Sequence, residues 1–163
     1  MKTRTRSRVY LSMAAMMLTA TVAVPTAARH VPFKGAFSGQ DTASPGPSAT
    51  ELLDTAATGT GTHLGQFSLA QVLTVNLANH TAIGSARWIV ANGDYIDTTV
   101  VSAAEPADIP DLLKVTEINT ITGGTGRFTG AEGSFTVERL HNLVTSATFG
   151  SFHGTITSTG AAR

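Results

Sequence analysis

Four side chains that could bind a ligand or transfer a proton alternate with apolar residues in two stretches of the C-terminal half. In residues 115–122, Glu117 and Asn119 fall on one face of an expected strand, and in residues 134–141, Arg139 and His141 do the same, because successive side chains of a strand point to opposite faces. If these faces turn toward the interior of a small β domain, Glu117 must be paired or protonated, since an isolated buried carboxylate is costly. Arg139, on the next strand along the chain, is its natural partner.

Two interpretations of this set stay open. In the functional one the residues line a pocket, where Glu117 or His141 is the catalytic residue that polarises a substrate. Asn119 and Arg139 then bind the ligand's polar atoms, and Trp88 supplies apolar surface. In the structural one, Glu117 and Arg139 form an ion pair at a solvated rim, and Trp88 is an ordinary core aromatic. Ion pairs inside barrels are commonly structural, so the charges alone do not decide.

Other site chemistries lack their signatures. Neither His-x-His nor His-x-x-x-His spacing occurs among the five histidines, and there is no cysteine, so we expect no metal. Gly123-Gly124-Thr125-Gly126 is followed by Phe128 and a further expected strand, whereas a phosphate loop needs a Lys and a helix at that point. No Gly-x-Ser-x-Gly elbow for a nucleophile is present. We therefore expect no cofactor.

The elements that must position these residues are expected to be short strands. Gly and Thr are abundant, and no long amphipathic helix is apparent. Antiparallel strands of this kind favour closure into a barrel, which leaves no exposed edge. The pattern predicts an all-β fold, a single eight-stranded antiparallel β-barrel, with strands at residues 33–39, 62–69, 72–77, 83–91, 95–102, 115–122, 134–141 and 148–157. Eight strands leave an interior just wide enough for packed side chains or one small ligand.

Three connections carry specific expectations. Asn92-Gly93 lies between two apolar runs and predicts a hairpin with a type I′ turn, since both residues accept a positive φ. Residues 42–61 are rich in Gly, Ala, Thr and Pro and predict a long surface loop, with a single helical turn over 49–54 as an option. In the glycine-rich connector, Phe128 and Ala131 are expected to plug one end of the barrel.

The N-terminus has the three parts of a secretory signal. Four basic residues between positions 2 and 8 precede an uncharged, mostly apolar stretch at 9–24, and Thr26-Ala27-Ala28 then offers small residues, which predicts cleavage after Ala28. The alternative, an uncleaved membrane anchor, would need about 20 apolar residues. We therefore predict a signal peptide at 1–28, a β-barrel domain at 29–163, and secretion to an extracellular or periplasmic location, with no membrane segment after cleavage.

The composition of the expected mature chain narrows the range of partners. Residues 29–163 hold seven Lys and Arg against eleven Asp and Glu, a net charge of −4. A mildly acidic domain without a basic cluster is a poor candidate for nucleic acid or for an anionic membrane surface, so we expect neither as a partner. Without cysteine no disulfide can form, and stability must come from burial and backbone pairing.

Residues 121–134, which read ITGGTGRFTGAEGS, resemble the Gly-Gly-Thr-Gly-x-Phe-x-x-Ala-x-Gly segment shared by allene oxide cyclases and dirigent proteins. Residues 62–67 and 150–156 are similar to secreted bacterial relatives of this group. The resemblance implies a calycin-type barrel with a central cavity, often a homo-oligomer, whose members bind hydrophobic small molecules and steer cyclisation or radical coupling without a cofactor. Plant allene oxide cyclases carry a Glu-x-Asn motif on the first strand. Residues 34–40 here contain neither Glu nor Asn, so the resemblance supplies no catalytic residue.

Two functions from different classes follow as hypotheses. The first is a secreted protein that holds a small hydrophobic molecule in the barrel, or a stable extracellular barrel that acts through its loops. The second is a cofactor-independent cyclase or isomerase, in which the cavity holds a substrate in a reactive conformation. Whether the protein is an enzyme stays open at this point. A dry barrel filled with side chains would reject both ligand-based versions, and an open pocket on the order of several hundred Å³ with converging polar groups would favour the enzyme.

Overall fold

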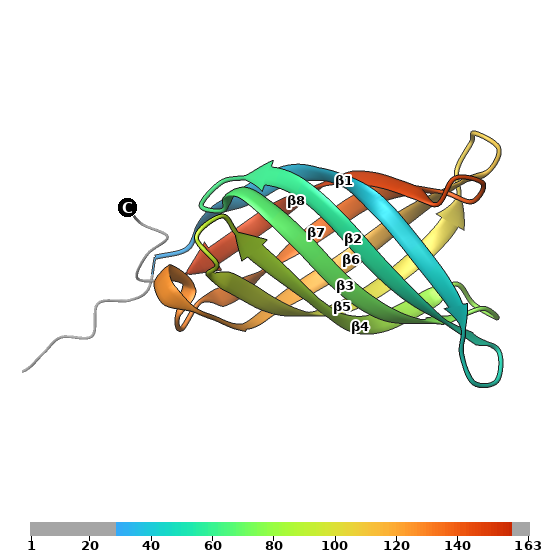
Figure 1. The fold of residues 1–163 in the computed structure, drawn as a ribbon, viewed down its shortest axis with the longest axis horizontal. Helices are drawn as coiled ribbons and strands as arrows, with labels where there is room; N and C mark the ends of the chain where they lie inside the picture. The colour runs from blue at the N-terminus through green and yellow to red at the C-terminus, as the bar shows by residue number, and fades with distance from the viewer. Residues whose placement is uncertain (1–28, 158–163) are drawn as a thin grey trace, which may run out of the picture.

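The computed structural model describes residues 29–157, which form one closed antiparallel barrel of eight strands in sequence order (Figure 1). The strands are β1 (Val31–Pro45), β2 (Thr50–Gly61), β3 (Gly65–Asn76), β4 (Thr81–Val90), β5 (Tyr95–Pro106), β6 (Leu112–Gly124), β7 (Glu132–Asn142) and β8 (Ala147–Thr157). Pairing of β1 with β8 closes the sheet. The predicted all-β, eight-stranded antiparallel barrel is confirmed. The predicted signal peptide, residues 1–28, lies outside the described residues.

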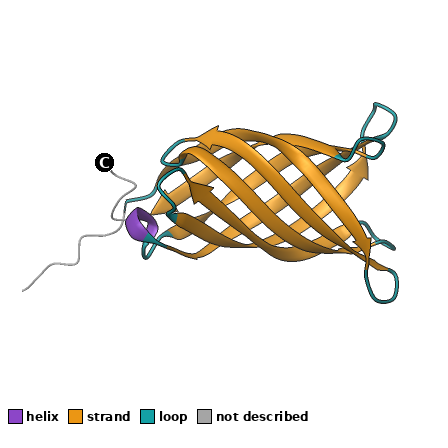
Figure 2. Ribbon diagram, viewed as in Figure 1, coloured by secondary structure: helices purple, strands orange, loops and turns teal. Residues whose placement is uncertain are grey.

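A short helical turn, η1 (Gly126–Phe128), lies in the connection between β6 and β7 (Figure 2). Within residues 29–157, no helix is long and apolar enough to cross a membrane.

The side chains along each strand alternate regularly between the interior and the exterior of the barrel. In β6, for example, Val115, Glu117, Asn119 and Ile121 are buried, while the residues between them are exposed. This is the alternation that the sequence predicted for this segment.

Residues 42–61 are not a loop. β1 continues to Pro45 and β2 begins at Thr50, so residues 46–49 alone connect them, and the helical turn over 49–54 is wrong as well. The Gly- and Ala-rich composition of this region is typical of a loop, but here small residues are required because neighbouring strands of the barrel approach each other closely. Gly39 of β1 lies opposite Ala57 of β2, and a Cβ at Gly39 would lie 2.5 Å from the Ala57 Cα. Pairing with two neighbouring strands overrides the weak strand propensity of Gly and Ala.

Residues 62–69 and 72–77 belong largely to one strand, β3, rather than to two. The expected total of eight was therefore reached through two errors that cancel, because β3 was counted twice and β2 was missed. Gln71 explains the first error. Its polar side chain interrupts the apolar pattern, although it is buried and continues the inward face of Phe67, Leu69 and Leu73.

The hairpin between β4 and β5 forms at Asn92-Gly93, but its turn is of another type. Gly93 has φ 88°, as expected, while Asn92 is not among the described residues with positive φ. The Gly93 N–H donates to the Val90 carbonyl over 2.9 Å, and this geometry is that of a type I turn followed by a left-handed residue. The Asn92 side-chain oxygen accepts from the Asp94 N–H at 3.1 Å, which holds the turn closed.

The two ends of the barrel differ. At one end, to the left in Figure 1, lie η1 and the links between β2 and β3 and between β4 and β5. We call this the plugged end, because Leu64 and Phe128 are fully buried there and Arg127 Nη2 donates to the Leu64 carbonyl at 3.2 Å. Ala131 is also buried, as expected for the connector. The opposite end, the hairpin end, carries the links at 46–49, 77–80, 107–111 and 143–146.

Candidate functional site

Polar side chains from six strands meet inside the barrel, in the half nearer the hairpin end. One connected network is formed by Asp41, Thr55, Gln71, Glu117, Arg139, His141 and Thr148. Strand register brings them together. Asp41 lies opposite Thr55, which lies opposite Gln71, and His141 lies opposite Thr148. A buried polar network of this kind is stable only when its members satisfy one another.

Arg139 is the centre of this network. Its Nε donates to Glu117 Oε1 at 2.8 Å, and its Nη1 donates to Asp41 Oδ2 and to the Thr148 hydroxyl, each at 2.9 Å. Its side chain is 2% exposed. Burial alone would lower the pKa of Arg139, but the carboxylates of Glu117 and Asp41 outweigh it and raise that pKa above its ordinary value. The guanidinium is therefore a permanent buried cation. The predicted pairing of Glu117 with Arg139 is present, and it lies in the interior, not at a solvated rim.

Asp41 is the member that the sequence interpretation missed. Its Oδ1 accepts from the Thr55 hydroxyl at 2.6 Å, and its Oδ2 lies 2.6 Å from His141 Nδ1. Burial raises the pKa of Asp41, but the hydrogen bond from His141, the Arg139 charge and the Thr55 hydroxyl together hold it below its usual value. Asp41 is therefore ionised near neutral pH, so Nδ1 of His141 carries the proton in this contact. The sequence does indicate that Asp41 faces the interior, because it continues the alternation of Phe33 and Phe37 once the strand is extended past Gly39.

His141 is the part of the network closest to solvent. Its side chain is 15% exposed, compared with 1% for Asp41. With Nδ1 fixed on a carboxylate, Nε2 is the ring nitrogen left to exchange a proton with a bound molecule. A carboxylate behind an imidazole fixes both its tautomer and its orientation, as in catalytic triads. His141 therefore has the geometry of a general base or acid at the hairpin end.

Glu117 has both carboxylate oxygens engaged. Oε1 accepts from Arg139, and Oε2 accepts from Gln71 Nε2 at 2.9 Å. The residue is 2% exposed. A carboxylate held by two donors has little capacity left for a substrate. Of the two predicted catalytic residues, His141 has the better geometry for proton transfer. Glu117 instead balances the positive charge of Arg139.

Trp88 and Asn119 stand apart from this network. Trp88 lies in a cluster of aromatic rings, with its ring centroid 5.1–6.2 Å from those of Phe37, Phe67, Phe135 and Phe152. Asn119 is fully buried and accepts a hydrogen bond from the Thr98 hydroxyl at 2.8 Å. The barrel interior is thus divided into an aromatic cluster nearer the plugged end and a polar network nearer the hairpin end.

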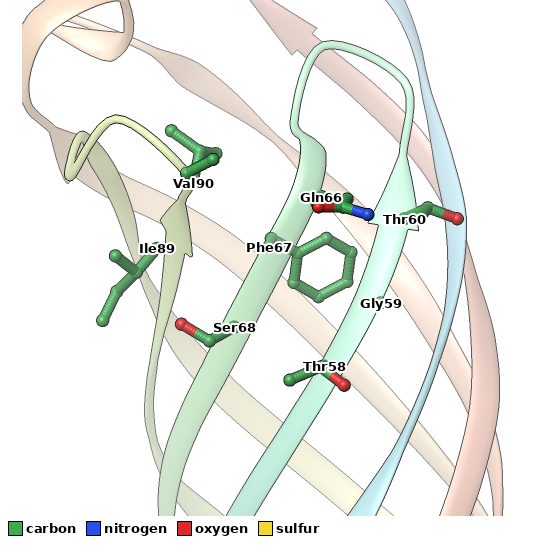
Figure 3. Close-up of a pocket in the computed structure, with 9 residues that line it drawn as sticks. Thr58, Gly59, Thr60, Gln66, Phe67, Ser68, Ile89 and Val90 are labelled. Atoms are coloured by element: carbon green, nitrogen blue, oxygen red, sulfur yellow. The ribbon is translucent and has the colours of Figure 1, made fainter.

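The grooves found on the barrel lie on its outer face. One, of about 530 Å³, is lined by outward-facing side chains of β2, β3 and β4, among them Thr58, Gln66, Ser68 and Ile89 (Figure 3). None of the predicted site residues contributes to it. No group of three or more His, Asp or Glu residues within 29–157 is arranged to hold a metal ion. Of the predicted site residues, Glu117, Arg139 and His141 are joined in the interior through hydrogen bonds that include Asp41, and Arg139 also lines a groove formed mainly by β1, β7 and β8. Trp88 and Asn119 are buried in the interior outside this network.

Comparison with known proteins gives a fold and no family. No family model matches the chain, and no curated protein matches it. Among solved structures, the chain is similar to that of the pterocarpan synthase dirigent protein GePTS1. The TM-score is 0.56 at 11% sequence identity, over 86% of this chain and 98% of the other. The chain has a dirigent-like barrel fold. At this identity the similarity concerns the fold alone.

The dirigent-like barrel also explains the glycine-rich segment that carried the resemblance. Residues 121–134 form the end of β6, η1 and the start of β7. Gly126 and Gly133 have φ of 54° and 136°, conformations that favour glycine. The segment therefore turns the chain sharply and places Phe128 at the plugged end. Its part is structural, since the hydrogen-bond network lies in the other half of the barrel.

Proposed function

We propose that this dirigent-like barrel is exported and binds a small hydrophobic molecule in its interior, where the aromatic cluster meets the polar network. The observation that carries the proposal is this division of one interior into an apolar and a hydrogen-bonding half. Binding pockets for small organic molecules combine mostly apolar walls with a few placed polar groups. The name of the similar structure, a pterocarpan synthase, supports a role in small-molecule chemistry.

The direction of access follows from the two ends. The plugged end is closed by Leu64 and Phe128, at 2% and 0% exposure. At the hairpin end the network finishes at the partly exposed His141. The molecule therefore enters past His141. The aromatic rings already touch one another, with centroids 4.9–6.2 Å apart, so this half of the interior is filled with side chains, the result that counts against a ligand in a preformed cavity. A molecule can bind there only if these side chains shift.

A native mass spectrum of protein purified from its own host tests this proposal. We expect an added mass that disappears on denaturation and can be extracted into organic solvent. Two variants localise it. Ala86 faces the interior and is 4% exposed, so Ala86→Leu should fill the interior and abolish the added mass. Ser68 lies in the outer groove, so Ser68→Lys should keep it. Protein without any added mass, in a correctly folded wild type, would instead favour a barrel that acts through its loops.

The contact between Asp41 and His141 favours a second function, a cofactor-independent cyclase or isomerase. Nδ1 is held 2.6 Å from Asp41 Oδ2, so Nε2 is oriented to take a proton from a substrate and return it at another atom. Such a reaction leaves the substrate mass unchanged. Incubation with an organic extract of the host, followed by chromatography with mass detection, should then convert one compound into an isomer. His141→Gln should abolish the conversion. Conversion that survives this substitution would rule the mechanism out.

A further inference from the structure

Two buried N–H donors inside the barrel lack an acceptor among the described residues. They are Nε1 of Trp88 and Nδ2 of Asn119, in residues that are 1% and 0% exposed. An indole nitrogen can only donate, so rotation of the side chain offers it no other role. A buried donor without a partner is costly, and native proteins rarely leave one unpaired. Two in one interior point to a bound group that supplies the acceptor.

Trp88 and Asn119 share neighbouring side chains. Asn119 lies directly opposite Phe135, whose ring centroid is 5.2 Å from that of Trp88. Thr98 makes a second link. Its hydroxyl donates to Asn119 Oδ1 at 2.8 Å and lies 3.4 Å from the carbonyl of Ala86, two residues before Trp88 on β4. Both residues are therefore adjacent to Phe135 in the interior, and Asn119 lies two residues from Glu117 of the polar network on the inward face of β6.

The surroundings restrict the acceptor to an uncharged oxygen. Two carboxylates, Asp41 and Glu117, already share the single guanidinium of Arg139, so a further anion would add to an unbalanced negative charge. The aromatic rings on the other side favour a planar apolar body. We propose that Trp88 and Asn119 bind a neutral carbonyl or ether oxygen of a small, largely aromatic molecule. This inference rests on the proposed function and names the chemical class of its ligand.

Trp88 is the only tryptophan of the chain, so its indole N–H gives a single, unambiguous NMR signal. The probes are acetophenone and α-methylstyrene, which have nearly the same shape and differ in a carbonyl oxygen against a methylene. Acetophenone should bind at least about tenfold more tightly, the ratio that corresponds to about 1.4 kcal/mol for a hydrogen bond. It should also move the indole proton downfield, and α-methylstyrene should not.

Two variants sharpen the comparison. Asn119→Leu removes one donor and should reduce the preference for acetophenone severalfold. Ser102→Ala is the control, because Ser102 is a buried residue on the interior face of β5 and its hydroxyl contacts neither donor. That variant should keep the preference. If Asn119→Leu fails to fold, the wild-type indole signal still gives the answer.

The possible results distinguish failure of this oxygen site from failure of the proposed small-molecule binding. Equal binding of both probes with an unmoved indole signal overturns the oxygen site but leaves a hydrophobic ligand in the barrel. Binding of neither probe overturns both. If, in addition, the free protein shows an indole proton that already exchanges magnetisation with water, a buried water is the acceptor, and the two donors do not form a ligand site.

Discussion

Arg139 is the residue on which the buried charges of this barrel depend. Arg139→Met would leave the carboxylates of Glu117 and Asp41 buried beside each other without a cation, and breaking a buried ion pair in this way typically costs about 3–5 kcal/mol. Replacing Glu117 as well should not restore stability, because Asp41 would still lack the guanidinium of Arg139. We expect the triple variant Asp41→Asn/Glu117→Gln/Arg139→Met to recover much of the loss in denaturant unfolding. Near-zero effects in all variants would show that the network is not formed.

Asp41 gives the stability of the protein a defined dependence on pH. Its pKa in the folded protein lies below the ordinary value of 3.8, so the unfolded chain takes up a proton first as the pH falls. The stabilising contribution of Asp41 is therefore complete well above pH 3.8 and is lost as the pH falls toward the folded pKa. Unfolding of the wild type and of Asp41→Asn, measured from pH 7 to pH 2.5, should show a difference that shrinks below about pH 4. A constant difference across this range would contradict the assignment.

At the scale of single residues, period-two alternation predicted the inward faces of β6 and β7, and with them Glu117, Asn119, Arg139 and His141. The same rule could not reach Asp41 and Thr55. Asp41 lies just before the region expected to be a loop and Thr55 lies inside it, so neither was assigned to the face of a strand. Gln71 lies between the two strands expected at 62–69 and 72–77, so the pattern did not predict it as a buried partner of Glu117.

At the scale of elements, the turn between β4 and β5 depends on the conformation of one glycine. Gly93 has φ 88°, and a Cβ there would meet nothing within 4 Å. Gly93→Val should therefore cost about 1–3 kcal/mol through backbone strain alone. Gly123 is the matched control, because it also has open space at its Cβ position but no positive φ. Gly123→Val should leave the melting temperature nearly unchanged. Equal losses in both variants would show that the left-handed conformation is not the cause.

Closure into an antiparallel barrel could be predicted from the sequence, while the boundaries of the N-terminal strands could not, and the expected number of eight strands depended on two errors that cancelled. Alternating apolar residues and the Asn-Gly turn mark β4 to β8 well. β2 has few large apolar residues, and its inward face consists of side chains such as Leu53, Thr55 and Ala57. Its strand conformation comes from pairing with β1 and β3 along its whole length. Such long-range pairing is not encoded in local composition.

At the scale of the whole molecule, export is the first expectation to check. The tripartite N-terminus predicts cleavage after Ala28, so protein collected from outside the cytoplasm should begin near Arg29 on N-terminal sequencing. The described barrel begins with β1 at Val31, so cleavage at this point would leave all eight strands intact. Recovery of a form that retains Met1 outside the cell would contradict the signal peptide.

The central claim is that a small molecule binds inside the barrel and not in a groove on its outer face. Backbone amide NMR during titration with acetophenone tests it most directly. We predict that the shifted amides belong to Thr98 and Asn119, at the junction of the two halves, and to His141, on the path by which the molecule enters. Shifts concentrated instead at Thr58, Gln66 and Ser68, which line the outer groove, or no shifts at any position, would contradict the account.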